Sequence, residues 1–169
     1  MQAALAAAAT AAVSEAEKID AGVRRIAAEN FHLTLAFLGS IPLSRLAEVE
    51  DVASRCARVL AADDAPIEIV LDGIEHWRKP QILCVTASGA PTVAIALAEM
   101  LKRSLLEQGF NPDLKPFRVH ATVARKVRRV TGELRVDPVQ WRFESLHLIE
   151  SRRSPTGSAY TPIREWRLR

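Results

Sequence analysis

One four-residue pattern, histidine–apolar–threonine–apolar, occurs twice in this chain. The first copy is His32–Leu35 (HLTL) and the second is His120–Val123 (HATV), and about half of the 169 residues separate them. Residues i and i+2 of a β-strand project from the same face. Each copy is therefore expected to place an imidazole and a hydroxyl on one surface while its apolar residues enter the core. Two such strands, each following a predicted helix, indicate an internal duplication about a pseudo-two-fold axis.

This pairing favours acid–base chemistry on a phosphate. Two imidazoles have an unperturbed pKa near neutrality, so one can accept a proton while the other donates one. Threonine hydroxyls can donate hydrogen bonds to phosphate oxygens. The sequence contains no Walker loop or carboxylate cluster that would indicate a metal-dependent alternative. For either copy alone, a strand with an internally satisfied polar pair is the competing interpretation.

The apolar periodicity predicts an antiparallel α+β fold. Helices are expected over about 2–18, from an N-cap at Ser44 to just before Asp63, and from Thr92 to a C-cap at Gly109. Helices are few and most strands meet through turns, which favours α+β over a parallel doubly wound sheet. No low-complexity linker divides the chain, so we expect one domain, 1–169, with two lobes. The expected strands lie at 23–26, 31–38, 67–71, 82–86, 116–125, 141–151 and 160–168, with a loop at 73–81.

Composition and charge limit the ligands, the compartment and the classes of protein that are compatible with this chain. The formal net charge of +3 is compatible with an anionic ligand without requiring one. Cys56 and Cys84 form no CxxC pair, which predicts two buried thiols in a reducing compartment. The Ala-rich N-terminus lacks the basic segment of a signal peptide, and no apolar run of about 18 residues indicates a membrane span. We therefore expect a cytoplasmic monomer that needs no metal or other cofactor.

Three segments together resemble the 2H phosphoesterase superfamily. They are AENFHLTLAFLG (28–39), GFNPDLKPFRVHATVAR (109–125) and ESRRSPTGSAYTPI (150–163). Their order is similar to that of the bacterial and archaeal RNA 2′,3′-cyclic phosphodiesterases, once named 2′-5′ RNA ligases. The resemblance extends from about Arg24 to the C-terminus. It implies a bilobal fold with two antiparallel sheets, helices packed outside, and a central groove lined by one His-x-Thr strand from each lobe.

The resemblance also implies an activity and a role for each paired residue. The reaction is hydrolysis of a 2′,3′-cyclic phosphate, at RNA 3′ ends or in small cyclic nucleotides, to a 2′-phosphate. His32 would protonate the leaving 3′-oxygen and His120 would activate water, while Thr34 and Thr122 would bind the phosphate oxygens. The two copies are symmetric in sequence, so the assignment of acid and base comes from the resemblance alone.

Further residues are weaker candidates for the site. Arg125 matches the family's phosphate-contacting arginine, but strand parity puts it opposite His120 unless the strand bulges or ends near Ala124. Trp77 would offer a stacking face for a base or serve as a partly buried anchor. Tyr160 would close one side of the site. Finally, the candidates include a basic run that is either a solvated turn or a lip for an RNA end: Arg125, Lys126, Arg128 and Arg129.

One departure from the family pattern leaves the function open. Family members begin with a strand before the first helix, whereas this chain starts in the helix at MQAALAAAA, so we expect that first strand to be absent. Its absence would expose a sheet edge and predicts weaker nucleotide affinity or lowered activity. Two alternatives to hydrolysis therefore stay open: a module that binds RNA ends or nucleotides with little turnover, and a 2′-5′ RNA ligase or phosphodiesterase using the same groove.

Overall fold

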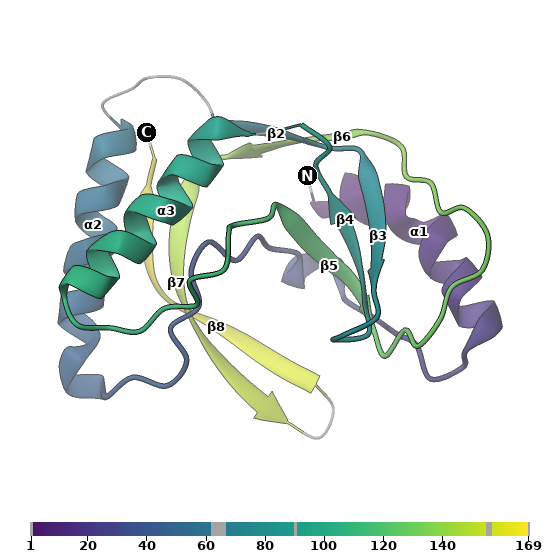
Figure 1. Cartoon of the computed structure of the whole chain (residues 1–169), viewed down its shortest axis with the longest axis horizontal. Coiled ribbons are helices and arrows are strands. Elements are labelled where there is room, and N and C mark those ends of the chain that lie inside the picture. The colour runs from purple at the N-terminus through teal and green to yellow at the C-terminus, as the bar shows by residue number, and fades with distance from the viewer. Residues whose placement is uncertain (1, 62–66, 90, 155–156, 169) are drawn as a thin grey trace. The chain divides into compact units, whose positions relative to one another are not determined.

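The computed structural model describes residues 2–61, 67–89, 91–154 and 157–168. In these residues the chain alternates helices with antiparallel strands, as the α+β prediction requires (Figure 1). The helices are α1 (Gln2–Ile19), α2 (Leu46–Ala61), α3 (Thr92–Glu107) and the short 3-10 helices η1 (Ala28–Asn30) and η2 (Leu43–Arg45). The strands are β1 (Arg24–Arg25), β2 (Ile67–Leu71), β3 (Gly73–Trp77), β4 (Ile82–Thr86), β5 (His120–Arg125), β6 (Val139–Phe143), β7 (Ser145–Ser154) and β8 (Gly157–Arg167).

The chain divides into two compact units, in agreement with the expected bilobal organisation. Unit 1 comprises Met1–Thr34, Glu68–Pro91 and Arg118–Arg142, and unit 2 comprises Leu35–Ile67, Thr92–Phe117 and Phe143–Arg169. Both His-x-Thr pairs belong to unit 1, so the expectation of one pair in each lobe was wrong. The reason is local, because the chain leaves unit 1 directly after Thr34 and Leu35 already packs against the core of unit 2.

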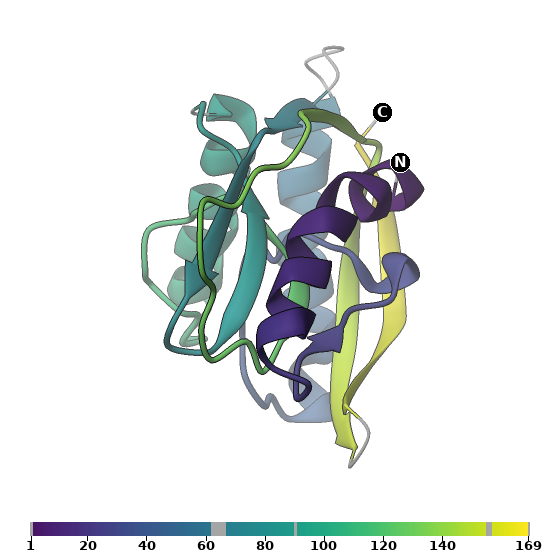
Figure 2. The ribbon, with the colours of Figure 1, turned by 90° about the vertical axis from the view of Figure 1, so that its right-hand side faces the viewer.

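Unit 1 is built on a four-stranded sheet of order β1-β5-β4-β3, with α1 covering one face (Figure 2). The helix forms because alanine has the highest helix propensity. Its buried residues recur at helical spacing and form one stripe toward the sheet. Small alanine side chains in that stripe let the helix lie close to the strands. The stripe consists of Leu5, Ala9, Ala12, Val13 and Ala16.

Unit 2 is built from α2, α3 and the β7–β8 hairpin. Buried side chains of α2 and α3 form one cluster, against which Leu146 and Leu148 of β7 pack. Gly109, with φ of +74°, ends α3 in the left-handed conformation expected of a C-cap glycine. The Phe110 amide then donates to the Leu105 carbonyl at 2.9 Å, which closes the helix end. The cluster contains Val49, Val52, Cys56, Leu97, Leu101, Leu105 and Phe110.

Most predicted elements are confirmed, and three details are wrong. Residues 31–38, all of them described, form no strand: the backbone at Phe31 is extended, but no ladder is assigned to the segment. Of these eight residues only Phe31 is buried, and Phe37 is 62% exposed. A strand also needs a hydrogen-bonding partner, which the apolar alternation does not specify. The predicted loop at 73–81 contains β3, whose Trp77 pairs with Ile82. Ser44 lies inside η2 and does not cap α2.

The predicted limits of one helix and two strands also differ in detail or lie outside the described residues. The expected end of the second helix before Asp63 falls at residues 62–66, which lie outside the described residues. The predicted strand over 116–125 begins only at His120, and the one over 141–151 is divided between β6 and β7 at Glu144. Both cysteines are buried free thiols, as predicted. No helix in the described part of the chain is both long and apolar enough to cross a membrane.

Candidate active site

The second His-x-Thr copy lies on β5 with the expected alternation of faces. Ala121 and Val123 are fully buried on the side that α1 covers, whereas His120 and Thr122 are half-buried. The opposite face of the sheet therefore carries an imidazole and a hydroxyl two residues apart. The spacing alone predicted this arrangement, and the structure confirms it for this copy.

Two contacts fix the His120 ring. Its Nδ1 lies 2.8 Å from the Arg118 carbonyl oxygen, and because a carbonyl only accepts, Nδ1 carries the proton in this bond. The ring also packs against Trp77 of β3, with centroids 4.6 Å apart and planes inclined by 44°. The neutral imidazole then has its lone pair on Nε2, which is the nitrogen that can accept a proton.

The hydroxyl of Thr122 lies beside a buried thiol. Thr122 pairs with Cys84 of β4, and the Cys84 Sγ is 3.8 Å from the Thr122 Oγ1. Burial raises the pKa of Cys84 to about 11, and the contact with the Thr122 hydroxyl only partly opposes this rise. The thiol is therefore neutral at physiological pH, and Thr122 has an uncharged neighbour in the sheet.

A β-bulge decides the position of Arg125. Leu83 pairs with Ala124 and Cys84 pairs with Thr122, so Val123 is an extra residue on β5. Val123 and Ala124 are consecutively buried, and the alternation of faces shifts by one residue beyond them. Arg125 is consequently exposed on the side of the sheet that carries His120 and Thr122. This is the bulge that the sequence required before Arg125 could join the site.

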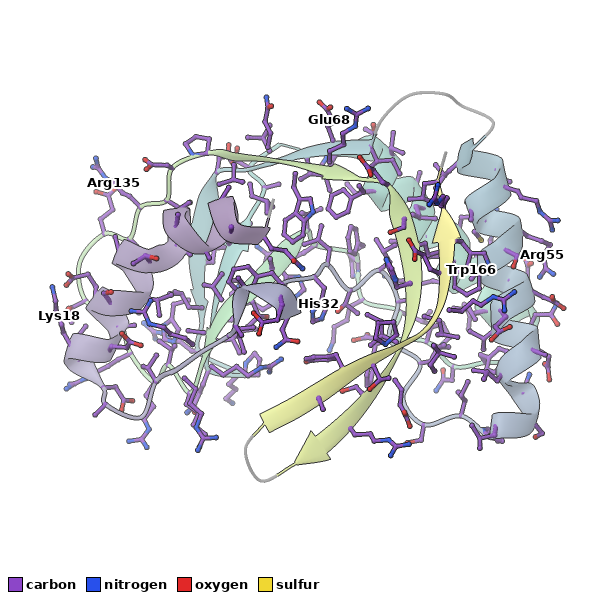
Figure 3. All side chains as sticks on the ribbon, turned by 180° about the vertical axis from the view of Figure 1, so that it is seen from behind. Lys18, His32, Arg55, Glu68, Arg135 and Trp166 are labelled. Carbon is purple, nitrogen blue, oxygen red and sulfur yellow. The ribbon has the colours of Figure 1, made fainter. Side chains whose placement is uncertain are left out.

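The first His-x-Thr copy follows η1 and is anchored by Phe31. Phe31 is 5% exposed and, with Ile26 and Val123, lines a small apolar pocket beneath α1. The Gln2 side-chain amide donates to the Phe31 carbonyl at 3.1 Å and ties the segment to α1. His32 comes next and is half-buried at the end of η1 (Figure 3). Thr34, the last residue of the first segment of unit 1, is exposed.

The two histidines share one local geometry. His32 Nδ1 lies 2.7 Å from the Asn30 carbonyl oxygen, just as His120 Nδ1 lies 2.8 Å from that of Arg118. In both cases the acceptor is the residue two positions earlier. The duplication visible in sequence thus extends to the tautomer, because both neutral rings carry their proton on Nδ1. Each Nε2 is the site at which a second proton binds.

The remaining candidates are distributed over both units. Trp77 is half-buried at the end of β3 and contacts His120, whereas Tyr160 is half-buried on β8 of unit 2, opposite Ser151. His76 Nε2 lies 2.7 Å from the Val127 carbonyl oxygen, which is a structural contact inside unit 1. His147 on β7 is exposed, with its Nε2 2.7 Å from Ser145 Oγ.

The basic run that begins at the last residue of β5 is exposed, and Val127, which interrupts it, is buried. Arg125 lies directly opposite Arg24 in the β1–β5 pair, and Arg128 pairs with Asp20 at 3.6 Å. Among the described residues, no three His, Cys, Asp or Glu side chains gather as a metal site would require.

Comparison with known proteins places the chain in a family. The model of the 2′-5′ RNA ligase superfamily matches residues 2–155. The chain belongs to this superfamily. Within it, an RNA 2′,3′-cyclic phosphodiesterase of Methanothermobacter thermautotrophicus is 28% identical over 88% of this chain and 84% of its own length. The protein of the same name from Escherichia coli K12 is 26% identical over 86% and 80%.

Solved structures agree with this membership. The protein TT0787 of Thermus thermophilus superposes with a TM-score of 0.75 at 26% identity, covering 96% of this chain and 91% of its own. Escherichia coli LigT complexed with 3′-AMP gives a TM-score of 0.74 at 22% identity over 96% and 90% of the two chains. The 2H phosphoesterase fold expected from the two His-x-Thr copies is thereby confirmed.

Sequence reasoning missed two residues beside His120. Glu75 accepts hydrogen bonds from Trp77 Nε1 at 2.8 Å and from Arg118 Nη2 at 3.0 Å. The position of Arg118 could have been predicted, because in an extended segment it shares a face with His120 two residues later. Nothing in the sequence indicated Glu75, since its segment was expected to be a loop.

Proposed function

We propose that this protein hydrolyses 2′,3′-cyclic phosphates, at RNA 3′ ends or in small nucleotides, to 2′-phosphates. The observation that carries the proposal is the shared geometry of His32 and His120, whose Nδ1 atoms each face the carbonyl of the residue two positions earlier. Two rings held in one tautomer present two Nε2 atoms for proton exchange. The relatives named RNA 2′,3′-cyclic phosphodiesterase support the choice of substrate.

The proposed step is an in-line attack of water on phosphorus. His120 Nε2 accepts a proton as the water oxygen bonds to phosphorus. His32, protonated on both nitrogens, donates its Nε2 proton to the departing 3′-oxygen as the bond between phosphorus and that oxygen breaks. The products are a 2′-phosphate and a 3′-hydroxyl, and exchange with solvent restores both rings. The assignment of base and acid follows the family resemblance.

Three side chains would stabilise the charge on the phosphoryl oxygens. Thr34 and Thr122 would donate hydroxyl hydrogen bonds, and such donors act most strongly where charge develops in the transition state. Arg125, which the bulge brings to the face of His120, would add a charge-assisted hydrogen bond. Trp77, in contact with His120, would border the base or ribose.

The test is a product assay with 2′,3′-cyclic AMP and with an oligoribonucleotide ending in a cyclic phosphate. Wild type is expected to yield the 2′-phosphate with and without EDTA. His32→Ala and His120→Ala should each lower the rate by about 10²–10⁴-fold. His147→Ala is the matched control, because this histidine is held by Ser145 on β7 and should retain wild-type activity. Near-full activity of both single variants, or strict dependence on a divalent metal, would refute the mechanism.

The same assay separates the two alternatives. A binding module would raise its melting temperature with 2′,3′-cyclic AMP but release no 2′-AMP. A ligase would join an RNA bearing a cyclic phosphate to one with a 5′-hydroxyl. Either result would replace hydrolysis as the assigned function.

A further inference from the structure

Glu75 lies on the same face of the sheet as the proposed catalytic residues of β5. It pairs with Cys84, which in turn pairs with Thr122, so the three residues form one row across β3, β4 and β5. Trp77 follows two residues later on the same face of β3. The β3 strand thus brings a carboxylate and an indole to the face that carries His120.

The Glu75 carboxylate holds both groups that contact His120. Its Oε2 accepts a hydrogen bond from Trp77 Nε1 at 2.8 Å, and both of its oxygens lie 3.0 Å from Arg118 Nη2. The Trp77 ring packs on the imidazole, and the Arg118 carbonyl accepts the proton of His120 Nδ1. The Arg118 guanidinium also lies over the Trp77 ring, 5.2 Å from its centroid. The Glu75 carboxylate therefore binds two residues, Trp77 and Arg118, that each contact His120.

We propose that Glu75 is a positioning residue for His120: by binding Trp77 and Arg118 together, it fixes the orientation and tautomer of the imidazole. The proposal rests on the proposed function for its catalytic consequence. Its structural part, the tautomer, does not depend on activity. A stability role alone does not account for the arrangement, because the side chains of Glu75 and Arg118 are 40% and 61% exposed. Ion pairs at that exposure contribute little to stability.

The experiment compares Glu75→Ala, Glu75→Gln and the control Asp72→Ala. Asp72 is a carboxylate of the same unit, and its two side-chain oxygens accept hydrogen bonds from the amide and the hydroxyl of Ser88. The rate is measured with 2′,3′-cyclic AMP. The tautomer of His120 is read from long-range proton–nitrogen NMR correlations above pH 8, without substrate.

The Glu75→Ala variant should lower kcat about 10- to 100-fold, the scale of a misplaced catalytic group, with KM within about twofold. Its melting temperature should stay close to that of wild type, and His120 should populate both tautomers. In Glu75→Gln, the amide oxygen can still accept from Trp77 Nε1, so kcat and the Nδ1–H tautomer should be largely recovered. Asp72→Ala should match wild type in both measurements.

Several outcomes would overturn the proposal. They are an unchanged His120 tautomer in Glu75→Ala, an equal loss of kcat in Asp72→Ala, or a Glu75→Gln variant no better than Glu75→Ala. If Glu75→Ala fails to fold, Trp77→Phe keeps a ring against His120 while removing the indole donor, and it should show the same mixture of tautomers. If wild type has no hydrolase activity, the proposed function fails, and the tautomer measurement still decides whether Glu75 positions the ring.

Discussion

The buried thiol of Cys84 makes the stability of this protein fall with alkaline pH in a way that can be calculated. Burial raises the pKa of Cys84 from 9.0 to about 11. The folded state therefore keeps a proton that the unfolded state releases as the pH passes 9. Below about pH 8 both states carry the neutral thiol, and Cys84 contributes no pH dependence.

The magnitude follows from the difference between the two pKa values. At about pH 10, most unfolded chains carry a thiolate while most folded chains still carry a thiol. The fraction of chains with a protonated thiol is then about tenfold larger in the folded state than in the unfolded state. This difference lowers the free energy of unfolding by about 1.4 kcal/mol relative to pH 8. If the pH continues through 11, the loss approaches about 2.7 kcal/mol.

Urea denaturation of wild type and Cys84→Ala at pH 8 and pH 10 measures this contribution. The alanine variant leaves a small cavity, but that cost is the same at both pH values. Lysine and tyrosine titrations are common to both proteins and cancel. Wild type should lose about 1.4 kcal/mol more than Cys84→Ala between the two pH values. An equal loss in both proteins would refute the assignment of a raised pKa to a buried, neutral Cys84 beside Thr122.

Three further substitutions test the site and the fold. Thr122→Val removes a hydroxyl that we expect to bind a phosphoryl oxygen, and kcat should fall by about 10²-fold while circular dichroism stays unchanged. Arg125→Met should raise KM about tenfold, because the bulge at Val123 puts this guanidinium on the face of His120, and a KM equal to wild type would place it outside the site. Gly109→Ala should cost about 1 kcal/mol in urea denaturation because φ is +74°, and the cost is conformational, since apart from its chain neighbours no described atom lies within 4 Å of the added methyl group.

The helices and the placement of His120 and Thr122 on one face of β5 could be predicted because they depend on local pattern. The 3.6-residue period determines the three helices, and the i, i+2 rule places His120 and Thr122 together once residues 120–125 form a strand. The same rule predicted a strand at residues 31–38, and the structure has none there. Whether an extended segment joins a ladder depends on a partner that is distant in sequence.

The position of Arg125 shows a second limit of pattern reasoning. Strict alternation puts it on the wrong face, and only the pairing of β5 with β4 reveals Val123 as an extra residue. The contact of Glu75 with Arg118 is equally nonlocal, since it joins residues 43 positions apart along the chain. The His-x-Thr spacing therefore predicted which side chains share a face of β5. The residues that contact those side chains could be identified only from the pairing of the strands.

The central claim is that His32 and His120 act as acid and base, and a change of leaving group tests it most directly. Sulfur in place of the 3′-oxygen of the cyclic phosphate can leave as a thiolate without prior protonation, because thiols are far more acidic than alcohols. On this substrate His32→Ala should recover a rate close to that of wild type, whereas His120→Ala should remain about 10²–10⁴-fold slower. Recovery by His120→Ala, or by neither variant, would contradict the assignment.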